Sequence, residues 1–209
     1  NIYIVDIPLN HKNFSVRDKN FYIKKSFDVG LNLLKENNSV ALINGPISKS
    51  TFLKGKYNGI TEYLAYKTRS LNEVMLIFNN ELSVSPMTTH VPINKVTEKI
   101  KKKIIVNKIS SINKFYKKFL GFRPNIAITG LNPHCETFVG KNVEKTEILP
   151  AIKILKKKKI KILGPFSADT IFLKKNRIGF DVVVGMYHDQ VLTPMKTIFG
   201  FDAINLTIG

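Results

Sequence analysis

The chain has 209 residues, and 33 Lys and Arg against 15 Asp and Glu give it a formal net charge of +18. With 44% hydrophobic and 23% charged residues, the composition is that of a folded globular protein and excludes a disordered tail. No apolar run approaches the roughly 18 to 20 residues that a membrane span needs, so no membrane partner is expected. The single cysteine, Cys135, excludes an intrachain disulfide and favours a reducing, cytoplasmic location.

Lysine supplies most of the positive charge, because only four of the 33 basic residues are Arg. Proteins that read nucleic acids usually enrich Arg, whose forked side chain binds bidentately. The densest runs, Lys99 to Lys103 and Lys156 to Lys161, are interpreted first as solvated helix faces. Attraction of an anionic small substrate is the second interpretation, and a basic nucleic-acid-binding module is the third. No nucleic-acid partner is therefore expected.

The predicted elements alternate between strands and helices. Their strands are mostly continuous apolar runs, which predicts an α/β sheet covered by helices on both faces. In such sheets, ligands bind at the loops that follow the carboxyl ends of the strands. The expected order is strand 2–5, helix 21–36, buried strand 40–43, helix 61–69, a hairpin of strands 73–78 and 82–87, helix 93–119 with a break near Asn107, strand 125–129, helix 145–158, strand 160–163, helix 168–175, and strands 181–184 and 203–208.

Three histidines follow predicted strands: His90, His134 and His188. Imidazoles are the commonest protein ligands of metal ions, and three of them leave an ion open positions for water or substrate. The alternative is three loop histidines that are hydrogen-bonded separately. Asp189 either orients the neighbouring imidazole or is an ordinary helix cap, and Cys135 is either a fourth ligand or a half-buried thiol.

Two loops suggest phosphate binding. Residues 44–50 follow a predicted strand and combine a glycine, hydroxyls and a lysine, without the spacing of a Walker A loop. Residues 164–170 are similar and include Asp169 as an early-helix carboxylate. A strand-to-helix turn with a capping serine explains the first loop equally well. The G-x-G-x-x-G fingerprint of Rossmann dinucleotide sites is absent.

Together, these segments resemble the 4-hydroxythreonine-4-phosphate dehydrogenase family of vitamin B6 (pyridoxal phosphate) biosynthesis. The matching segments keep the family's order and spread over nearly the whole chain. They are Asn44-Gly-Pro-Ile-Ser-Lys49, Gly59-Ile-Thr-Glu62, Thr88-Thr-His-Val-Pro92, Gly130-Leu-Asn-Pro-His134, Gly164-Pro-Phe-Ser-Ala-Asp-Thr170, Met186-Tyr-His-Asp-Gln190 and Ala203-Ile-Asn-Leu-Thr-Ile-Gly209.

The resemblance implies an isocitrate/isopropylmalate dehydrogenase-like layered α/β fold, NAD, a divalent metal (Zn, Mg or Co) and a homodimer with its active site at the interface. The family's metal ligands fall on His90, His134 and His188, with one of the three supplied by the partner subunit. Its contacts to a small phosphorylated substrate fall on Thr61, Asp169, Lys196 and Asn205. Residues that bind NAD are not assigned.

The implied reaction is the NAD-dependent, metal-assisted oxidation of 4-phosphooxy-L-threonine, followed by decarboxylation to 3-amino-2-oxopropyl phosphate. The metal would lower the pKa of the substrate hydroxyl, so that hydride moves to NAD. We expect residues 1–209 to be one incomplete unit of a two-lobed enzyme that continues beyond both ends.

The chain departs from the family at Ile60, where an imidazole that contacts substrate is usual. A paralogous dehydrogenase of another phosphorylated hydroxy acid is therefore the first alternative. A three-histidine metal hydrolase, which needs no NAD, is a more distant alternative, as is the nucleic-acid-binding module.

Overall fold

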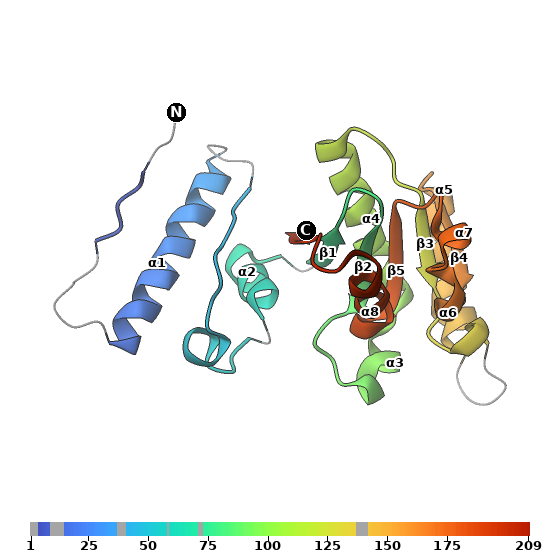
Figure 1. Cartoon of the computed structure of the whole chain (residues 1–209), viewed down its shortest axis with the longest axis horizontal. Helices are drawn as coiled ribbons and strands as arrows, with labels where there is room; N and C mark the ends of the chain where they lie inside the picture. The colour runs from blue at the N-terminus through green and yellow to red at the C-terminus, as the bar shows by residue number, and fades with distance from the viewer. Residues whose placement is uncertain (1–3, 9–14, 37–40, 58, 71–72, 137–141) are drawn as a thin grey trace. The chain divides into compact units, whose positions relative to one another are not determined.

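The computed structural model describes residues 4–8, 15–36, 41–57, 59–70, 73–136 and 142–209. The chain forms two compact units, residues 1–69 (unit 1) and residues 70–209 (unit 2), which are labelled by their elements in Figure 1. The sequence shows no clear boundary within the chain, whereas the structure divides it between Arg69 and Ser70.

Unit 2 is built on a six-stranded sheet with the order β4-β3-β5-β2-β1-β6. The strands from β4 to β2 are parallel, whereas β1 is antiparallel to both of its neighbours. Val182, Val183 and Val184 of β5 are each 0% exposed, as expected for a strand that is covered on both faces. The strands are Val74–Phe78 (β1), Ser83–Thr88 (β2), Ile126–Thr129 (β3), Ile162–Phe166 (β4), Val182–Tyr187 (β5) and Ile204–Ile208 (β6).

Helices cover both faces of this sheet, which confirms the predicted layered α/β class. Because side chains alternate along a strand, Val184 packs into one core with Ile109 and Leu155, whereas Val183 packs into a second core with Val191. The helices are α3 (Val96–Lys99), α4 (Lys102–Phe115), α5 (Leu149–Lys157), α6 (Ala168–Ile171), α7 (Lys174–Arg177) and α8 (His188–Phe199), with shorter turns η2 (Ile93–Lys95), η3 (Tyr116–Leu120), η4 (Pro133–Cys135) and η5 (Glu144–Ile148).

Unit 1 contains the helices α1 (Val16–Lys35) and α2 (Ile60–Thr68) and the π-helical turn η1 (Lys49–Leu53). Its core is a small, largely aromatic cluster of Phe27, Leu53 and Tyr63, in which the rings of Phe27 and Tyr63 meet edge to face with centroids 5.5 Å apart. An ion pair between Lys67 and Asp28 joins α2 to α1.

The structure corrects the two strands predicted in unit 1. Residues 2, 3 and 40 lie outside the described residues. Ile4 and Val5 form no strand, and neither do residues 41–43, where Ile43 is 94% exposed. A strand needs backbone partners on a neighbouring segment, and no strand lies among the described residues of unit 1 to provide them.

The structure also moves the predicted break in helix 93–119. The chain breaks at Ile100 and Lys101, which have extended backbones, and Asn107 lies inside α4. The break buries Ile100, and the carboxylate of Glu147 accepts a hydrogen bond from the backbone N–H of Lys102 at 2.7 Å. This distant cap satisfies a free donor at the start of α4, and sequence periodicity does not reveal it.

The predicted hairpin is confirmed, because β1 and β2 pair antiparallel with Ile77 opposite Val84. The side-chain Oδ1 of Asn79 accepts a hydrogen bond from the backbone N–H of Glu81 at 2.8 Å within the turn. The turn-prone asparagines at 79 and 80 therefore act as predicted.

Candidate active site

The carboxyl ends of the four parallel strands carry the predicted site residues of unit 2. Along the sheet, His90 follows β2, His188 follows β5, His134 follows β3 and Asp169 follows β4. Parallel strands present their carboxyl ends at one edge, so residues that are far apart in sequence share that edge. These four residues therefore lie at the strand ends where a ligand site is expected.

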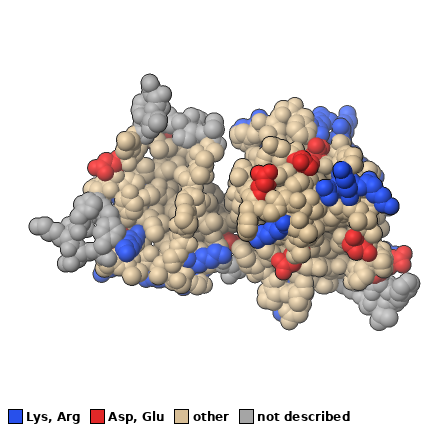
Figure 2. All heavy atoms as spheres, in the orientation of Figure 1, with Lys and Arg blue, Asp and Glu red and all other residues tan. Residues whose placement is uncertain are grey.

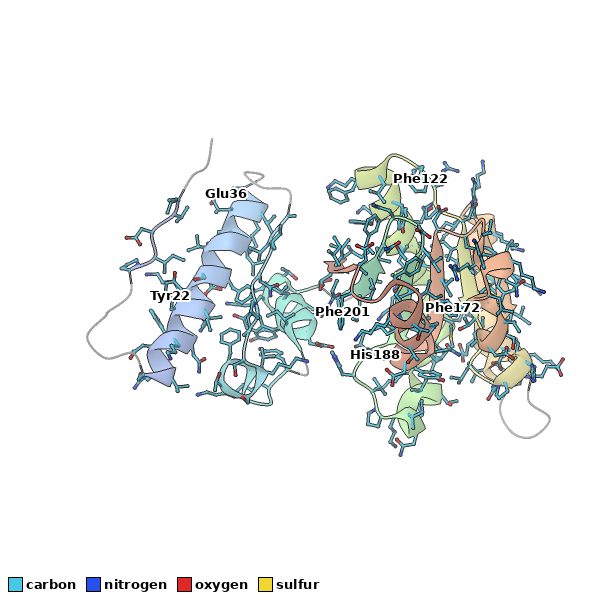
Figure 3. The ribbon with its side chains drawn as sticks, in the orientation of Figure 1. Tyr22, Glu36, Phe122, Phe172, His188 and Phe201 are labelled. Carbon is cyan, nitrogen blue, oxygen red and sulfur yellow. The ribbon has the colours of Figure 1, made fainter. Side chains whose placement is uncertain are left out.

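His90 and His188 lie close together, with ring centroids 6.2 Å apart. Two imidazoles bound to one ion through nitrogens about 2.0–2.1 Å from it place their centroids roughly 5 to 6 Å apart. The pair is therefore spaced to share an ion after a small adjustment. His90 is exposed and His188, labelled in Figure 3 at the start of α8, is half-buried.

Asp189 orients His188. Its Oδ1 lies 2.6 Å from Nδ1 of the imidazole, and because a carboxylate only accepts, this hydrogen bond requires the proton on Nδ1. The Nε2 lone pair then faces away from Asp189, which is the usual arrangement behind a metal-binding histidine. Of the two roles considered for Asp189, the structure supports orientation of the imidazole.

His134 lies in the short turn η4 with a backbone φ of +53°, and the next residue, Cys135, has φ +61°. The left-handed region is uncommon for residues other than glycine, so this turn needs support from its surroundings. Gly130 leaves room for the side chain of Cys135, because a Cβ atom at position 130 would lie only 2.8 Å from Sγ of Cys135. Cys135 is half-buried, and burial raises the pKa of its thiol, which favours the predicted small neutral thiol.

Glu144 supports the same turn from η5. Its Oε1 accepts hydrogen bonds from the backbone N–H groups of Leu131 and Asn132, both at 2.8 Å, and its Oε2 accepts from Nδ2 of Asn132 at 2.9 Å. Glu144 is 2% exposed. Burial alone would raise the pKa of its carboxyl, but the hydrogen bonds from Asn132 and Leu131 outweigh burial and lower the pKa.

A further polar network joins the strand ends. Oε1 of Gln190 accepts from the hydroxyl of Thr129 at 2.8 Å and from the backbone N–H of Met186 at 2.6 Å, and its Nε2 donates to the carbonyl of Gly130 at 2.8 Å. The hydroxyl of Thr88 donates to the carbonyl of Met186 at 2.9 Å. The roles of Glu144 and Gln190 could not be predicted from sequence, because a polar residue in a helical stretch carries no local sign of a distant backbone partner.

One chain does not assemble all the predicted ligands. Among the described residues, no group of three or more His, Cys, Asp or Glu side chains could hold a metal ion. The structure thus brings His90 and His188 together, and the three predicted histidines do not form a metal-binding group within one chain.

The predicted substrate contacts fall on different elements. Thr61, in α2 of unit 1, is 8% exposed, and Asp169 is exposed in the first turn of α6. Lys196 is exposed on α8, with Nζ 5.8 Å from the ring centroid of Phe201. Asn205 is exposed on β6 and lies opposite Ile77 of β1. Ile77 in turn pairs with Val84, near the start of β2, whereas His90 follows the other end of β2.

The predicted phosphate loop at residues 44–50 is exposed except at a half-buried Ile47 and does not follow a strand. Ser48 lies at the cap position of η1, but its side chain makes no capping hydrogen bond there. The second loop, residues 164–170, does span the end of β4 and the start of α6, as expected.

Basic side chains gather on the surface of unit 2, as the face in Figure 2 shows. Lys101, Lys102 and Lys103 at the start of α4 are exposed, and so are Lys156 to Lys159 at the end of α5. These positions agree with the interpretation of the lysine runs as solvated helix faces. No helix among the described residues is long and apolar enough to cross a membrane.

Comparison with known proteins decides the family. The profile of the family described as "Pyridoxal phosphate biosynthetic protein PdxA" matches residues 2–209. The chain belongs to the PdxA family. PdxA-family membership agrees with the seven sequence segments and with the layered fold.

Two curated relatives carry the name 4-hydroxythreonine-4-phosphate dehydrogenase. The protein from Sulfurihydrogenibium sp. is 39% identical over 83% of this chain and 55% of its own length. The protein from Xanthobacter autotrophicus is 34% identical over 88% of this chain and 55% of its own length. The chain therefore spans about half the length of these PdxA-family relatives.

A crystal structure of a 4-hydroxythreonine-4-phosphate dehydrogenase from Burkholderia phymatum superposes with a TM-score of 0.77 at 31% identity. The match covers 94% of this chain and 61% of that one. The layered fold found here is therefore that of a solved structure carrying the same name.

Proposed function

We propose that this chain is part of an NAD-dependent 4-hydroxythreonine-4-phosphate dehydrogenase that acts in pyridoxal phosphate biosynthesis. It would oxidise 4-phosphooxy-L-threonine with the aid of a divalent metal (Zn, Mg or Co), and decarboxylation would yield 3-amino-2-oxopropyl phosphate. The observation that carries the proposal is the order of His90, His188, His134 and Asp169 along one edge of the parallel sheet. A cytoplasmic location is part of the proposal, since a single cysteine suits a reducing compartment.

The donor set fits a divalent ion. His90 and His188 have the spacing to hold it, with His134 as the third ligand, and nitrogen donors of this kind suit zinc and cobalt. A bound ion would polarise the substrate hydroxyl and so lower its pKa. Asp189 holds the proton on Nδ1 of His188 and so keeps Nε2 available to the ion.

The substrate's charged ends would meet residues that carry complementary groups. The ammonium of Lys196 and the amide of Asn205 suit a phosphate or a carboxylate, and both side chains are exposed. Because His90, His134 and His188 form no three-ligand group among the described residues of one chain, the proposal includes a homodimer in which a second copy completes the site. Thr61 and Asp169 remain proposed substrate contacts.

The test is metal-dependent NADH formation from 4-phosphooxy-L-threonine by the full-length protein. The expected result is turnover that a chelator abolishes and a divalent metal restores. His188→Ala should reduce turnover by at least a hundredfold, while Thr193→Ala, an exposed change on the same helix, should leave it unchanged. Metal-dependent ester hydrolysis without NADH formation would instead favour a metal hydrolase.

Ile60 favours one second candidate, a dehydrogenase of a related phosphorylated hydroxy acid. Its side chain packs against the aromatic cluster of unit 1 instead of offering an imidazole to a ligand. Loss of such a hydrogen bond to a charged substrate group costs about 1.5–3 kcal/mol, or roughly 10- to 150-fold in kcat/KM. Ile60→His should therefore raise kcat/KM for 4-phosphooxy-L-threonine if that is the natural substrate, and lower it for the preferred substrate of a paralogue.

A further inference from the structure

Gln190 is the point at which the loops that carry His134 and His188 are joined. It lies in the first turn of α8, two residues after His188, and its amide reaches across to β3. Its three hydrogen bonds use Oε1 twice and Nε2 once, and they reach Thr129, Gly130 and Met186. One side chain thus contacts the last residue of β3, the start of the His134 loop and the end of β5.

The close approach of α8 to β5 makes these contacts possible. Gly185 of β5 has no side chain, and a Cβ there would lie 2.4 Å from Cγ1 of Val191 and 3.0 Å from Oε1 of Gln190. Any larger residue would push the first turn of α8 away from the sheet. The glycine therefore places the amide of Gln190 within reach of both strands.

The polar groups that Gln190 satisfies are at the edge of a buried sheet. Thr129 is 0% exposed, and so is Met186. Removing the amide would leave a hydroxyl, a backbone N–H and a carbonyl without this partner, and each buried group that loses its partner carries a desolvation cost. The resulting relaxation is expected to be local, because the hydrogen-bonded ladder from Ile126 to Ile128 still holds β3 against β5.

We propose that Gln190 is a positioning residue that fixes the loops after β3 and β5 relative to each other, and with them His134 and His188. The inference rests on the proposed function, because it assigns these histidines to metal binding. Thr88 extends the connection to the His90 loop through the carbonyl of Met186, and Glu144 secures the far side of the His134 loop. Gln190 itself need touch neither metal nor substrate.

The variants Gln190→Ala and Gln190→Glu separate the hydrogen bond to Gly130 from the hydrogen bonds to Thr129 and Met186. Alanine removes all three hydrogen bonds. Glutamate can still accept from Thr129 and Met186, but it sets an oxygen against the carbonyl of Gly130 and so releases the His134 loop alone. Thr193→Ala, at an exposed position of the same helix, is the matched control.

The experiment measures amide hydrogen exchange in the metal-free full-length protein and the affinity of each variant for Zn²⁺ by chelator competition. Gln190→Ala should speed exchange in residues 130–136 and 186–189 by at least tenfold. Gln190→Glu should do so in residues 130–136 only. Zn²⁺ affinity should fall about 10- to 100-fold in Gln190→Ala, the usual effect of removing a supporting partner of a metal site.

The two readouts separate this inference from the function on which it rests. If the unaltered protein binds no Zn²⁺ but Gln190→Ala releases both loops, Gln190 is supported as a positioning residue and the metal function fails. If exchange in both loops stays at the level of Thr193→Ala, the inference is overturned, whatever the affinity. It is also overturned if exchange rises uniformly through unit 2, because Gln190 would then be a general stabilising residue.

Discussion

The two units of this chain stabilise their elements in different ways. Unit 2 has a six-stranded sheet with a hydrophobic core on each face, whereas unit 1 has two helices, one π-helical turn and a small aromatic cluster among its described residues. Similar apolar runs therefore have different outcomes. Residues 182–184 are completely buried between neighbouring strands, while residues 41–43 form no strand and Ile43 is 94% exposed. An apolar run becomes a strand only where partner strands flank it.

The largest expected effect lies in the core of unit 2. Ile109→Ala should lower the free energy of unfolding of this unit by about 4 kcal/mol, because Ile109 is 0% exposed and its loss leaves a cavity in a tightly packed layer. Denaturant unfolding followed by circular dichroism measures the change. The control is Ile104→Ala on the same helix, where the side chain is 39% exposed and the cost should stay below about 1 kcal/mol.

Phe27→Ala tests whether unit 1 depends on its aromatic cluster alone. Phe27 is 5% exposed, and its removal should destabilise unit 1 by about 3 kcal/mol. Amide exchange should then rise throughout α1 and α2 and remain slow in β5. Phe21→Ala, on the same helix but at a 64% exposed position, should leave both units unchanged. An equal rise in β5 would show that the two units do not unfold separately.

Glu144→Gln should destabilise unit 2 by about 2 kcal/mol at pH 7, since hydrogen bonds to a charged acceptor are stronger than neutral ones. The pKa of Glu144 is lowered from its ordinary value of 4.5 in the folded state, so the unfolded state takes up its proton first as pH falls. The contribution is therefore present above pH 4.5 and is lost as pH falls through the lower folded pKa. Urea titrations from pH 7 to pH 3 should show this loss in the unaltered protein and a flatter profile in Glu144→Gln.

The smallest effect concerns the start of α1. Ser15 and Asp18 form a reciprocal capping box, in which Oγ of Ser15 accepts from the backbone N–H of Asp18 at 3.2 Å. Ser15→Ala should cost about 1 kcal/mol and fray the first turn of α1. Exchange rates of the amides of residues 16–19 measure the fraying. Ser26→Ala, inside the same helix, removes a hydroxyl without a cap and should produce no fraying at the helix start.

Much of unit 2 could be predicted from sequence because its signals are local. The valine run of β5, the paired asparagines between β1 and β2, and the helical spacing of residues 145–158 each indicate an element without reference to the rest of the chain. The three histidines were likewise found from their positions after predicted strands. Their common edge then follows from parallel topology, which short alternating strands and helices favour.

The remaining features depend on contacts between distant residues. The break at Ile100 accompanies a cap from Glu147, and the His134 turn is held by Glu144, yet neither glutamate is distinguishable in sequence from a solvated helical residue. The role of Gln190 likewise depends on hydrogen bonds to Gly130 and Thr129, which lie about 60 positions earlier in the chain. In unit 1, residues 41–43 form no strand because no neighbouring strand pairs with them among the described residues, and the apolar run alone does not show whether such a partner exists.

Residue type and spacing are enough to predict the α/β class, the family resemblance and the three candidate histidines, because they carry that information directly. The folded arrangement is needed to see that His90 and His188 lie together, how Asp189 orients His188, and which buried polar groups hold the loops in place. The physical reason is that buried donors and acceptors must find partners wherever the fold brings them, and those partners are set by strand order and packing rather than by neighbouring residues.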